Sequence, residues 1–226
     1  MRIGNTKLVI VKGDITRQDT DAIVNAANIF LRGGSGVDGA IHKAGGPSVL
    51  EECKKVVPDG SILPTGNAVI TTSGNLPSKY IIHTVGPIWK GGKAGEEALL
   101  SSAYRESIKL AESRGLQSMS FPSISTGVFG YPVDKAAKVA IKAVTEALSK
   151  DSSIKEVRLV LYDDKSYNAY IEAAKPKVLV IDDSNIGLKF IKAIEVANST
   201  RKFKPQVPPK SSIPSTTNLR LTRKGR

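Results

Sequence analysis

A stretch of asparagine, glycine and aspartate follows an apolar segment near the start of the chain. It reads VNAANIFLRGGSGVDGAIHKAGG over residues 24–46 and contains Asn25, Asn28 and Asp38. Glycines let backbone N–H groups approach a ligand closely, and the start of a following helix carries partial positive charge. This order of residues favours phosphate binding, although neither the Walker A pattern nor GxGxxG is present. The alternative is a turn whose asparagine side chains bond only to their own backbone.

A second loop has the same character and lies about a hundred residues further along the chain. It reads PSISTGVFGYP over residues 122–132, where Ser125, Thr126 and Gly127 offer hydroxyl and amide groups before an expected helix. Two such loops at neighbouring strand ends would suit two phosphates in series, as in a diphosphate. The alternative is a pair of unrelated turns.

Two further side chains stand at the ends of apolar runs. Asp14, in GDIT, could accept hydrogen bonds from an exocyclic amine, and Tyr162, in LVLYDDK, could stack on a base. The alternative for Asp14 is a helix cap. The alternative for Tyr162 is a core aromatic whose hydroxyl reaches the surface.

The elements that must position these residues alternate along the chain. Apolar, β-branched runs predict strands at 7–11, 21–25, 67–71, 80–85, 118–122 and 156–162. Helical spacing predicts helices at 37–44, 48–57, 96–114, 134–149 and 166–174. Alternation of this kind predicts a three-layer α/β domain with a mixed, mostly parallel sheet. Ligands of such folds bind outside the carboxyl ends of the strands, where the candidate residues lie.

Charge is distributed unevenly along the 226 residues, whose formal net charge is +12. From residue 176 onward eleven lysines and arginines accompany three acidic residues. Residues 176–198 predict a possible extra strand and helix as an appendage. We expect residues 199–226 to form a disordered basic tail, which either keeps the protein in solution or contacts nucleic acid weakly.

Composition also limits the class of protein. One cysteine and two histidines argue against a His/Cys metal site, and the single cysteine excludes an internal disulfide. No run of 18 apolar residues and no signal-peptide pattern are present, so we expect a cytoplasmic protein without a membrane span.

Five motifs then occur in a fixed order: GDIT, AIVNAAN, GGSGVDGAIHKAGG, YIIHTVGP and FPSISTGVFGYP. In that order they resemble a macro domain, and most of all the MacroD-type branch of ADP-ribosyl hydrolases. The resemblance covers roughly Lys7 to Ala174, so we expect a macro domain over residues 1–175. It implies a three-layer α/β/α macro domain that binds ADP-ribose and needs neither a metal nor another cofactor.

The resemblance also implies a role for each matching residue. Asp14 and the Ile15 amide would contact adenine, Tyr162 would pack on it, and Asn28 would hold the hydroxyls of the distal ribose. Phe129 would cover that ribose. The two phosphate loops would comprise Ser35, Gly36 and Val37 in the first, and Ser125, Thr126, Gly127, Val128 and Phe129 in the second.

Asp38 decides between an enzyme and a simple binder, because it matches the catalytic aspartate of the hydrolytic members. In the first turn of a helix it is expected to be ionised. With Asn28 it would serve cleavage of acyl esters of ADP-ribose, namely O-acetyl-ADP-ribose and mono-ADP-ribosylated Glu or Asp of proteins. The alternative is a non-catalytic ADP-ribose reader with a nucleic-acid-associating tail.

Four residues near these motifs raise separate expectations. Ser35 stands where the family has glycine, so affinity would fall modestly if that position required a positive φ. We interpret Cys53 as a packed thiol and His83 as a satisfied core histidine. For His42 a role in packing or at the surface is favoured over support of Asp38.

Overall fold

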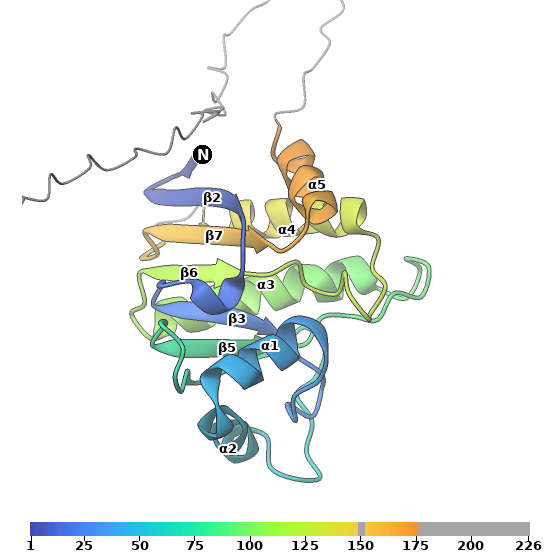
Figure 1. The fold of residues 1–226 in the computed structure, drawn as a ribbon. Helices are drawn as coiled ribbons and strands as arrows, with labels where there is room; N and C mark the ends of the chain where they lie inside the picture. Colours follow the sequence, from blue (N-terminus) through green and yellow to red (C-terminus); the bar gives the residue numbers. More distant parts are fainter. Residues whose placement is uncertain (149–151, 176–226) are drawn as a thin grey trace, which may run out of the picture. The chain divides into compact units, whose positions relative to one another are not determined.

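One mixed sheet forms the centre of the domain (Figure 1). The computed structural model describes residues 1–148 and 152–175. The strands are β1 (Arg2–Ile3), β2 (Thr6–Lys12), β3 (Ala22–Ala26), β4 (Ala68–Thr72), β5 (Tyr80–Thr84), β6 (Ser118–Phe121) and β7 (Glu156–Leu161). Within the described residues they form a seven-stranded sheet in the order β1-β2-β7-β6-β3-β5-β4.

The five inner strands are parallel, and both edge strands are antiparallel to their neighbours. The strands β2, β7, β6, β3 and β5 therefore all end at one edge of the sheet, although they are far apart in the sequence. Loops that follow these strands meet at that edge, which is where α/β folds place their ligands.

Helices cover both faces of the sheet (Figure 1). They are α1 (Gly36–Gly45), α2 (Pro47–Val56), α3 (Glu96–Ser113), α4 (Val133–Leu148) and α5 (Asp164–Ala174), together with a 3-10 turn at Ile15–Arg17. None of the described helices is long and apolar enough to cross a membrane.

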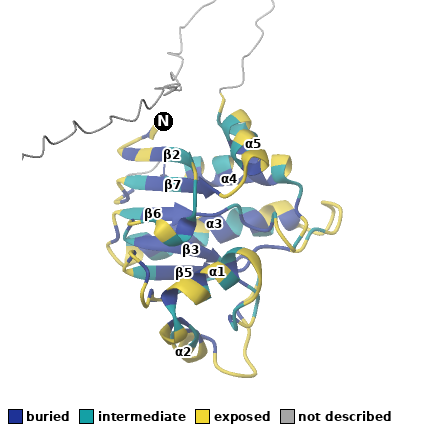
Figure 2. Ribbon diagram, viewed as in Figure 1, coloured by how far each residue is buried: buried dark blue, intermediate teal, exposed yellow. Residues whose placement is uncertain are grey.

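Two separate apolar clusters hold the layers together. One joins the sheet to α3, α4 and α5 and includes Tyr104, Phe121 and Tyr170. The other joins the sheet to α1 and α2 and includes Ile41 and Val49. Burial of the sheet on both faces (Figure 2) explains why the strands are almost continuously apolar rather than alternating.

The sequence-based predictions agree with this architecture. Each of the six predicted strands and five predicted helices is confirmed, with ends that differ by at most two residues. The two-residue strand β1 and the 3-10 turn at 15–17 were not predicted, because each is too short to show a periodic pattern. The predicted strand and helix at 176–198 and the basic tail at 199–226 lie outside the described residues.

Candidate functional site

Two adjoining cavities open along the carboxyl ends of the parallel strands. The central cavity, of about 260 Å³, lies at the ends of β3 and β6. The β7 cavity, of about 550 Å³, lies at the ends of β2 and β7. They share Gly36, Val37, Ser123 and Gly127, so they form one groove. No lysine or arginine is among the residues that line either cavity.

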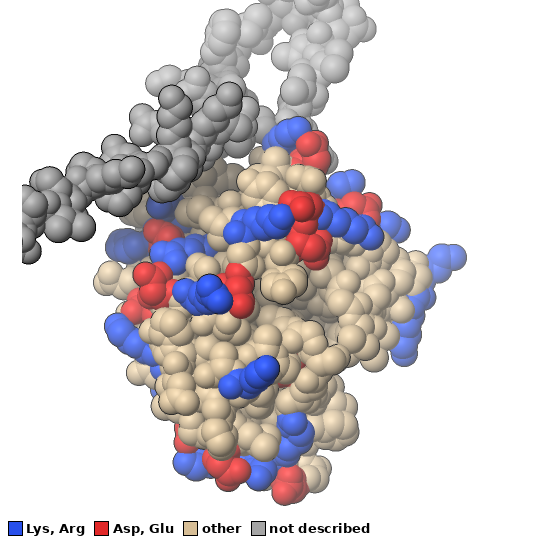
Figure 3. All heavy atoms as spheres, in the orientation of Figure 1, with Lys and Arg blue, Asp and Glu red and all other residues tan. Residues whose placement is uncertain are grey.

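All of the predicted site residues line this groove. Those of the central cavity are Asn28, Ser35, Gly36, Val37, Asp38, Ser125, Gly127, Val128 and Phe129. Those of the β7 cavity are Asp14, Ile15, Gly36, Val37, Thr126, Gly127 and Tyr162. On the face shown in Figure 3, most of the charged side chains lie around a hollowed area whose surface is mainly uncharged. A ligand anion in the groove would therefore be held by N–H and hydroxyl groups.

The glycine loop before α1 needs glycine for two reasons, namely close contacts at some positions and a positive φ at others. Gly36 has a φ of +60°, but Ser35 has a φ of −100° and is extended. The condition under which Ser35 would weaken binding is therefore not met. A Cβ at Gly34 would lie 3.0 Å from Oδ2 of Asp38, and a Cβ at Gly39 would lie 2.4 Å from the Gly34 carbonyl oxygen. Glycine at 34 and 39 lets the loop approach both the helix and the carboxylate.

Asp38 is the buried carboxylate of the central cavity, with only 4% of its surface exposed. Its Oδ1 accepts a hydrogen bond of 2.7 Å from Nδ2 of Asn25 and lies 3.4 Å from Nε2 of His42. Burial raises the pKa of Asp38, while the Asn25 hydrogen bond and the His42 charge oppose that shift. Burial thus works against the ionisation that the helix start favours.

A buried hydrogen-bond chain fixes Asn25 in turn. Nδ2 of Asn25 lies 3.1 Å from Nδ1 of His83, and Nε2 of His83 lies 2.9 Å from the Thr71 hydroxyl. Because Asn25 donates to Nδ1, the His83 proton belongs on Nε2 and is donated to Thr71, which itself donates to the Thr72 carbonyl. Burial lowers the pKa of His83 to about 3, so the ring is neutral. Strands β3, β4 and β5 together hold the amide that orients Asp38.

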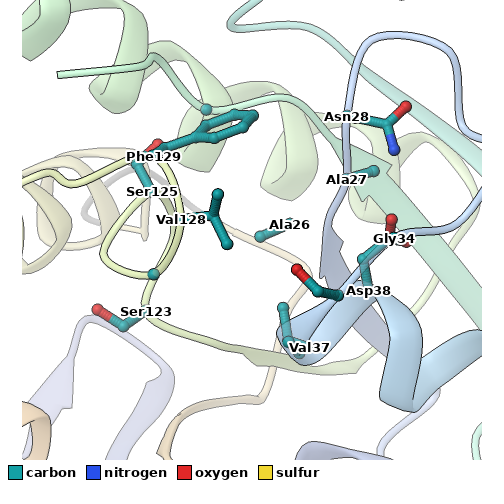
Figure 4. Close-up of a pocket in the computed structure, with 14 residues that line it drawn as sticks. Ala26, Ala27, Asn28, Gly34, Val37, Asp38, Ser123, Ser125, Val128 and Phe129 are labelled. Carbon is teal, nitrogen blue, oxygen red and sulfur yellow. The ribbon is translucent and has the colours of Figure 1, made fainter.

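Asn28 uses part of its side chain within its own loop. Its Oδ1 accepts from the Phe30 backbone N–H at 3.0 Å, and its Nδ2 donates to the Gly33 carbonyl at 2.7 Å. The alternative of a self-bonding turn is therefore correct for these two atoms. The second N–H of the Asn28 amide meets no acceptor among the described residues and is available to a ligand. Asn28 lies across the central cavity from Phe129 (Figure 4).

Ser125 holds an uncommon conformation at the far wall of the central cavity. Its φ of 67° is left-handed, and its buried hydroxyl has no hydrogen-bond partner among the described residues. A Cβ at Gly86, two residues beyond the end of β5, would lie 2.1 Å from that hydroxyl, so this position must be glycine to admit Ser125. A left-handed residue other than glycine costs about 1–3 kcal/mol and is typical of ligand sites.

Backbone N–H groups complete that wall. Within the described part of the chain, the N–H groups of residues 126–129 donate to no acceptor, while those of Gly130 and Tyr131 close the loop on the carbonyls of Gly127 and Ser125. The first turn of α1 likewise leaves N–H groups without partners inside the helix. Figure 4 shows the two loops on opposite sides of the cavity, so these donors can converge on one anionic ligand.

At the other end of the groove the polar groups are more open. Asp14 caps the 3-10 turn, and its Oδ1 accepts from the Thr16 N–H at 2.9 Å and from the Thr16 hydroxyl at 2.7 Å. Its Oδ2 accepts no hydrogen bond from the described residues. Tyr162 is 81% exposed, so the alternative of a core aromatic is wrong. Its ring lines the β7 cavity and is accessible to a ligand.

The remaining candidates are two core residues and His42, whose role stays a prediction. Cys53 is fully buried, and burial followed by the Asp38 charge raises the pKa of its thiol to about 12, which confirms a packed thiol. His83 is confirmed as a core histidine. His42 lies beside Asp38, a position that its spacing of four residues on one helix could have indicated.

No group of three or more His, Cys, Asp or Glu side chains within residues 1–148 and 152–175 could hold a metal ion.

The fold and the groove together define a class of protein: a three-layer α/β/α domain with two amide-lined loops and a buried carboxylate at the strand ends. The chain belongs to the macro domain family, whose model matches residues 24–140. It is 55% identical over 167 residues to a macro domain-containing protein, TTE0995, of Caldanaerobacter subterraneus, covering 74% of this chain and 95% of that protein. The O-acetyl-ADP-ribose deacetylase of Escherichia coli is 47% identical over 165 residues, which are 73% of this chain and 93% of that enzyme.

Solved structures agree with this assignment. The Oceanobacillus iheyensis macrodomain with ADP matches with a TM-score of 0.74 and 45% identity, over 76% of this chain and 92% of that one. The Trypanosoma brucei macrodomain in complex with ADP-ribose matches with a TM-score of 0.67 and 34% identity, over 73% and 68% of the two chains.

Proposed function

We propose that residues 1–175 are a hydrolase that binds ADP-ribose and cleaves its acyl esters. The substrates would be O-acetyl-ADP-ribose and proteins that carry mono-ADP-ribosyl groups on Glu or Asp. The observation that carries the proposal is Asp38, buried in the wall of the groove and held by Asn25. Further support comes from the relatives named O-acetyl-ADP-ribose deacetylase and from macrodomain structures with ADP and ADP-ribose.

The proposed ligand lies along the groove with its adenine in the β7 cavity. There Oδ2 of Asp14 would accept a hydrogen bond from the base, and the Ile15 N–H would donate one to it. The exposed ring of Tyr162 would pack on the base. The diphosphate would lie between the start of α1 and the loop at 125–129, where N–H groups have no other partner among the described residues. Partial positive charge at the helix start favours an anion there.

The distal ribose would then occupy the central cavity. The second N–H of the Asn28 amide, which meets no acceptor among the described residues, would hold a ribose hydroxyl, and Phe129 would cover the sugar. Such an arrangement brings the ester next to Asp38. Positioning of the reacting groups contributes most to the rate when the carboxylate cannot rotate. The hydrogen-bond chain from Thr71 through His83 and Asn25 holds the Asp38 carboxylate in this way.

Hydrolysis adds one water molecule across the ester. The ester C–O bond breaks, the acyl group leaves as a carboxylate, the sugar regains a hydroxyl, and one proton is released. Asp38 would orient the water or accept a proton from a ribose hydroxyl. Loop amides and the Ser125 hydroxyl, which lacks a partner among the described residues, would stabilise the developing negative charge. His42, 3.4 Å from Asp38, would stabilise the carboxylate when protonated.

The test compares the wild type with Asp38→Ala on O-acetyl-ADP-ribose, with calorimetric ADP-ribose binding on the same samples. We expect release of acetate to fall about 10³-fold, within the 10²- to 10⁴-fold range that a positioned general acid or base contributes. ADP-ribose affinity should change only a few-fold, because the diphosphate and adenine contacts remain. An Asp38→Ala protein with the wild-type rate would exclude this mechanism, and a wild type that binds without turnover would indicate a reader.

A further inference from the structure

A third hollow continues the groove past the central cavity, at the end of β5. This β5 cavity, of about 220 Å³, is lined mainly by apolar side chains: Ile29, Val85, Pro87, Ile88, Leu99 and Phe129. It shares Gly86 and Phe129 with the central cavity. None of the residues to which the sequence assigned a role, except Phe129, lines it.

The order of the three cavities follows the order of the strands in the sheet. The β7 cavity lies at the ends of β2, β7 and β6, the central cavity at those of β6 and β3, and the β5 cavity beside β5. In the proposed function the adenine occupies the first cavity and the distal ribose the second. A group attached to that ribose on the side away from the diphosphate therefore faces the third cavity, the β5 cavity.

We propose that the β5 cavity binds the acyl group of the ester, and that it favours aliphatic acyl chains longer than acetyl. The proposal rests on the proposed function. A single water needs about 10–15 Å³ of such space, so the cavity admits a group much larger than two carbons. Its apolar lining suits methylene groups, each of which contributes to binding when it leaves water.

The walls of the cavity are held in place by the fold. The Trp89 N–H donates to the Phe129 carbonyl at 2.8 Å, which ties the loop after β6 to the loop after β5. Oε1 of Glu96 accepts from the N–H groups of Lys90 and Gly92 at 2.9 and 3.0 Å, and Oε2 accepts from that of Ala94 at 2.6 Å. Because amides already occupy both oxygens, this carboxylate stabilises the wall. Thr65 and Lys90 are the other polar residues of the lining, which is otherwise apolar.

The test is a series of acetyl, propionyl, butyryl and hexanoyl esters of ADP-ribose. In the wild type, kcat/KM should rise roughly two- to fourfold with each methylene up to butyryl, since full burial of one methylene corresponds to about fourfold. In the Asp38→Ala protein, where hydrolysis is slow, the Kd of the same esters should tighten by the same factor. This second readout is independent of turnover.

A matched pair of variants locates the effect. Ile88 is 57% exposed and lines the cavity, whereas Ile62 is 53% exposed and lines none of the three cavities. Ile88→Ser should remove most of the chain-length preference and leave ADP-ribose binding unchanged, and Ile62→Ser should leave both unchanged.

Three outcomes remain distinct. Turnover that is independent of chain length, with equal values for both variants, would overturn the acyl site and leave the proposed function intact. A wild type that turns over none of the esters would overturn the proposed function. In that case, tightening of the Kd with chain length would still support the acyl site, and a flat Kd series would overturn it as well.

Discussion

The two ends of the groove differ in how their carboxylates are held. Asp14, at the β7 end, is anchored through one oxygen to Thr16, two residues away in the sequence. Asp38, in the central cavity, is anchored by Asn25 on another element, and a chain through His83 and Thr71 extends behind it. One carboxylate is positioned locally, and the other by three strands of the sheet.

This difference suggests that one end of the site determines affinity and the other determines the rate of the reaction. The β7 end is open, with Tyr162 exposed, and its groups can adapt to a planar base. The Asp38 end is buried, and its side chains have little freedom to reorient. Variants at the first end should therefore change affinity, whereas variants at the second should change the rate of chemistry.

After Asp38→Ala itself, the largest expected effect comes from Asn25→Ala, which leaves Asp38 in place but removes the hydrogen bond that holds it. We expect kcat to fall roughly 10²-fold, the size associated with a misplacement of about 1 Å, with ADP-ribose Kd within a few-fold. The Asn25 hydrogen bond lowers the pKa of Asp38, so its loss should raise that pKa further. If ionised Asp38 is the active form, the acid limb of kcat must move to higher pH.

Steady-state rates across pH check both parts of this prediction, and thermal unfolding of the same sample separates them from a loss of stability. A variant with reduced kcat and an unmoved acid limb would contradict control of Asp38 by Asn25.

An intermediate effect is expected from Asp14→Ala, at the locally held end. Loss of a hydrogen bond to a charged group, about 1.5–3 kcal/mol, should raise the Kd for ADP-ribose at least about tenfold. The kcat at saturating substrate should not change. Calorimetry measures the first and initial rates measure the second. Asp19→Ala is the matched control, because it removes the same charge nearby, where Asp19 pairs with Arg158 outside the groove. Equal Kd values for the two variants would argue against adenine recognition by Asp14.

The smallest effect is expected from Ser35→Gly, which restores the glycine of the family pattern. Because Ser35 has a φ of −100°, glycine gains no conformational advantage there. The ADP-ribose Kd should stay within about twofold of the wild-type value. The free energy of unfolding should fall by about 0.5–1 kcal/mol, because glycine gives the unfolded chain more conformational freedom. Binding that tightened tenfold would mean that the loop adopts a positive φ at this position when ligand is present.

Much of this molecule can be predicted from local patterns. The apolar runs and helical spacing predict each strand and helix of the described residues except β1 and the 3-10 turn, because such patterns reflect which faces of an element are buried. The motifs also identify which loops meet, since all of them follow parallel strands. Tyr162 shows the limit of such reasoning, because an aromatic at a strand end reads equally well as core or surface, and only the structure places it outside.

The sequence by itself determined the three-layer fold, the two amide-lined loops and the presence of an aspartate at the start of α1. Only the tertiary structure decided that Asn25, His83 and Thr71 form one chain behind that aspartate, and that three cavities follow one another along the sheet. The physical reason is that a buried polar group must find its partner among neighbours in space. Those neighbours depend on the strand order β7-β6-β3-β5-β4, which the order of residues along the chain does not reveal.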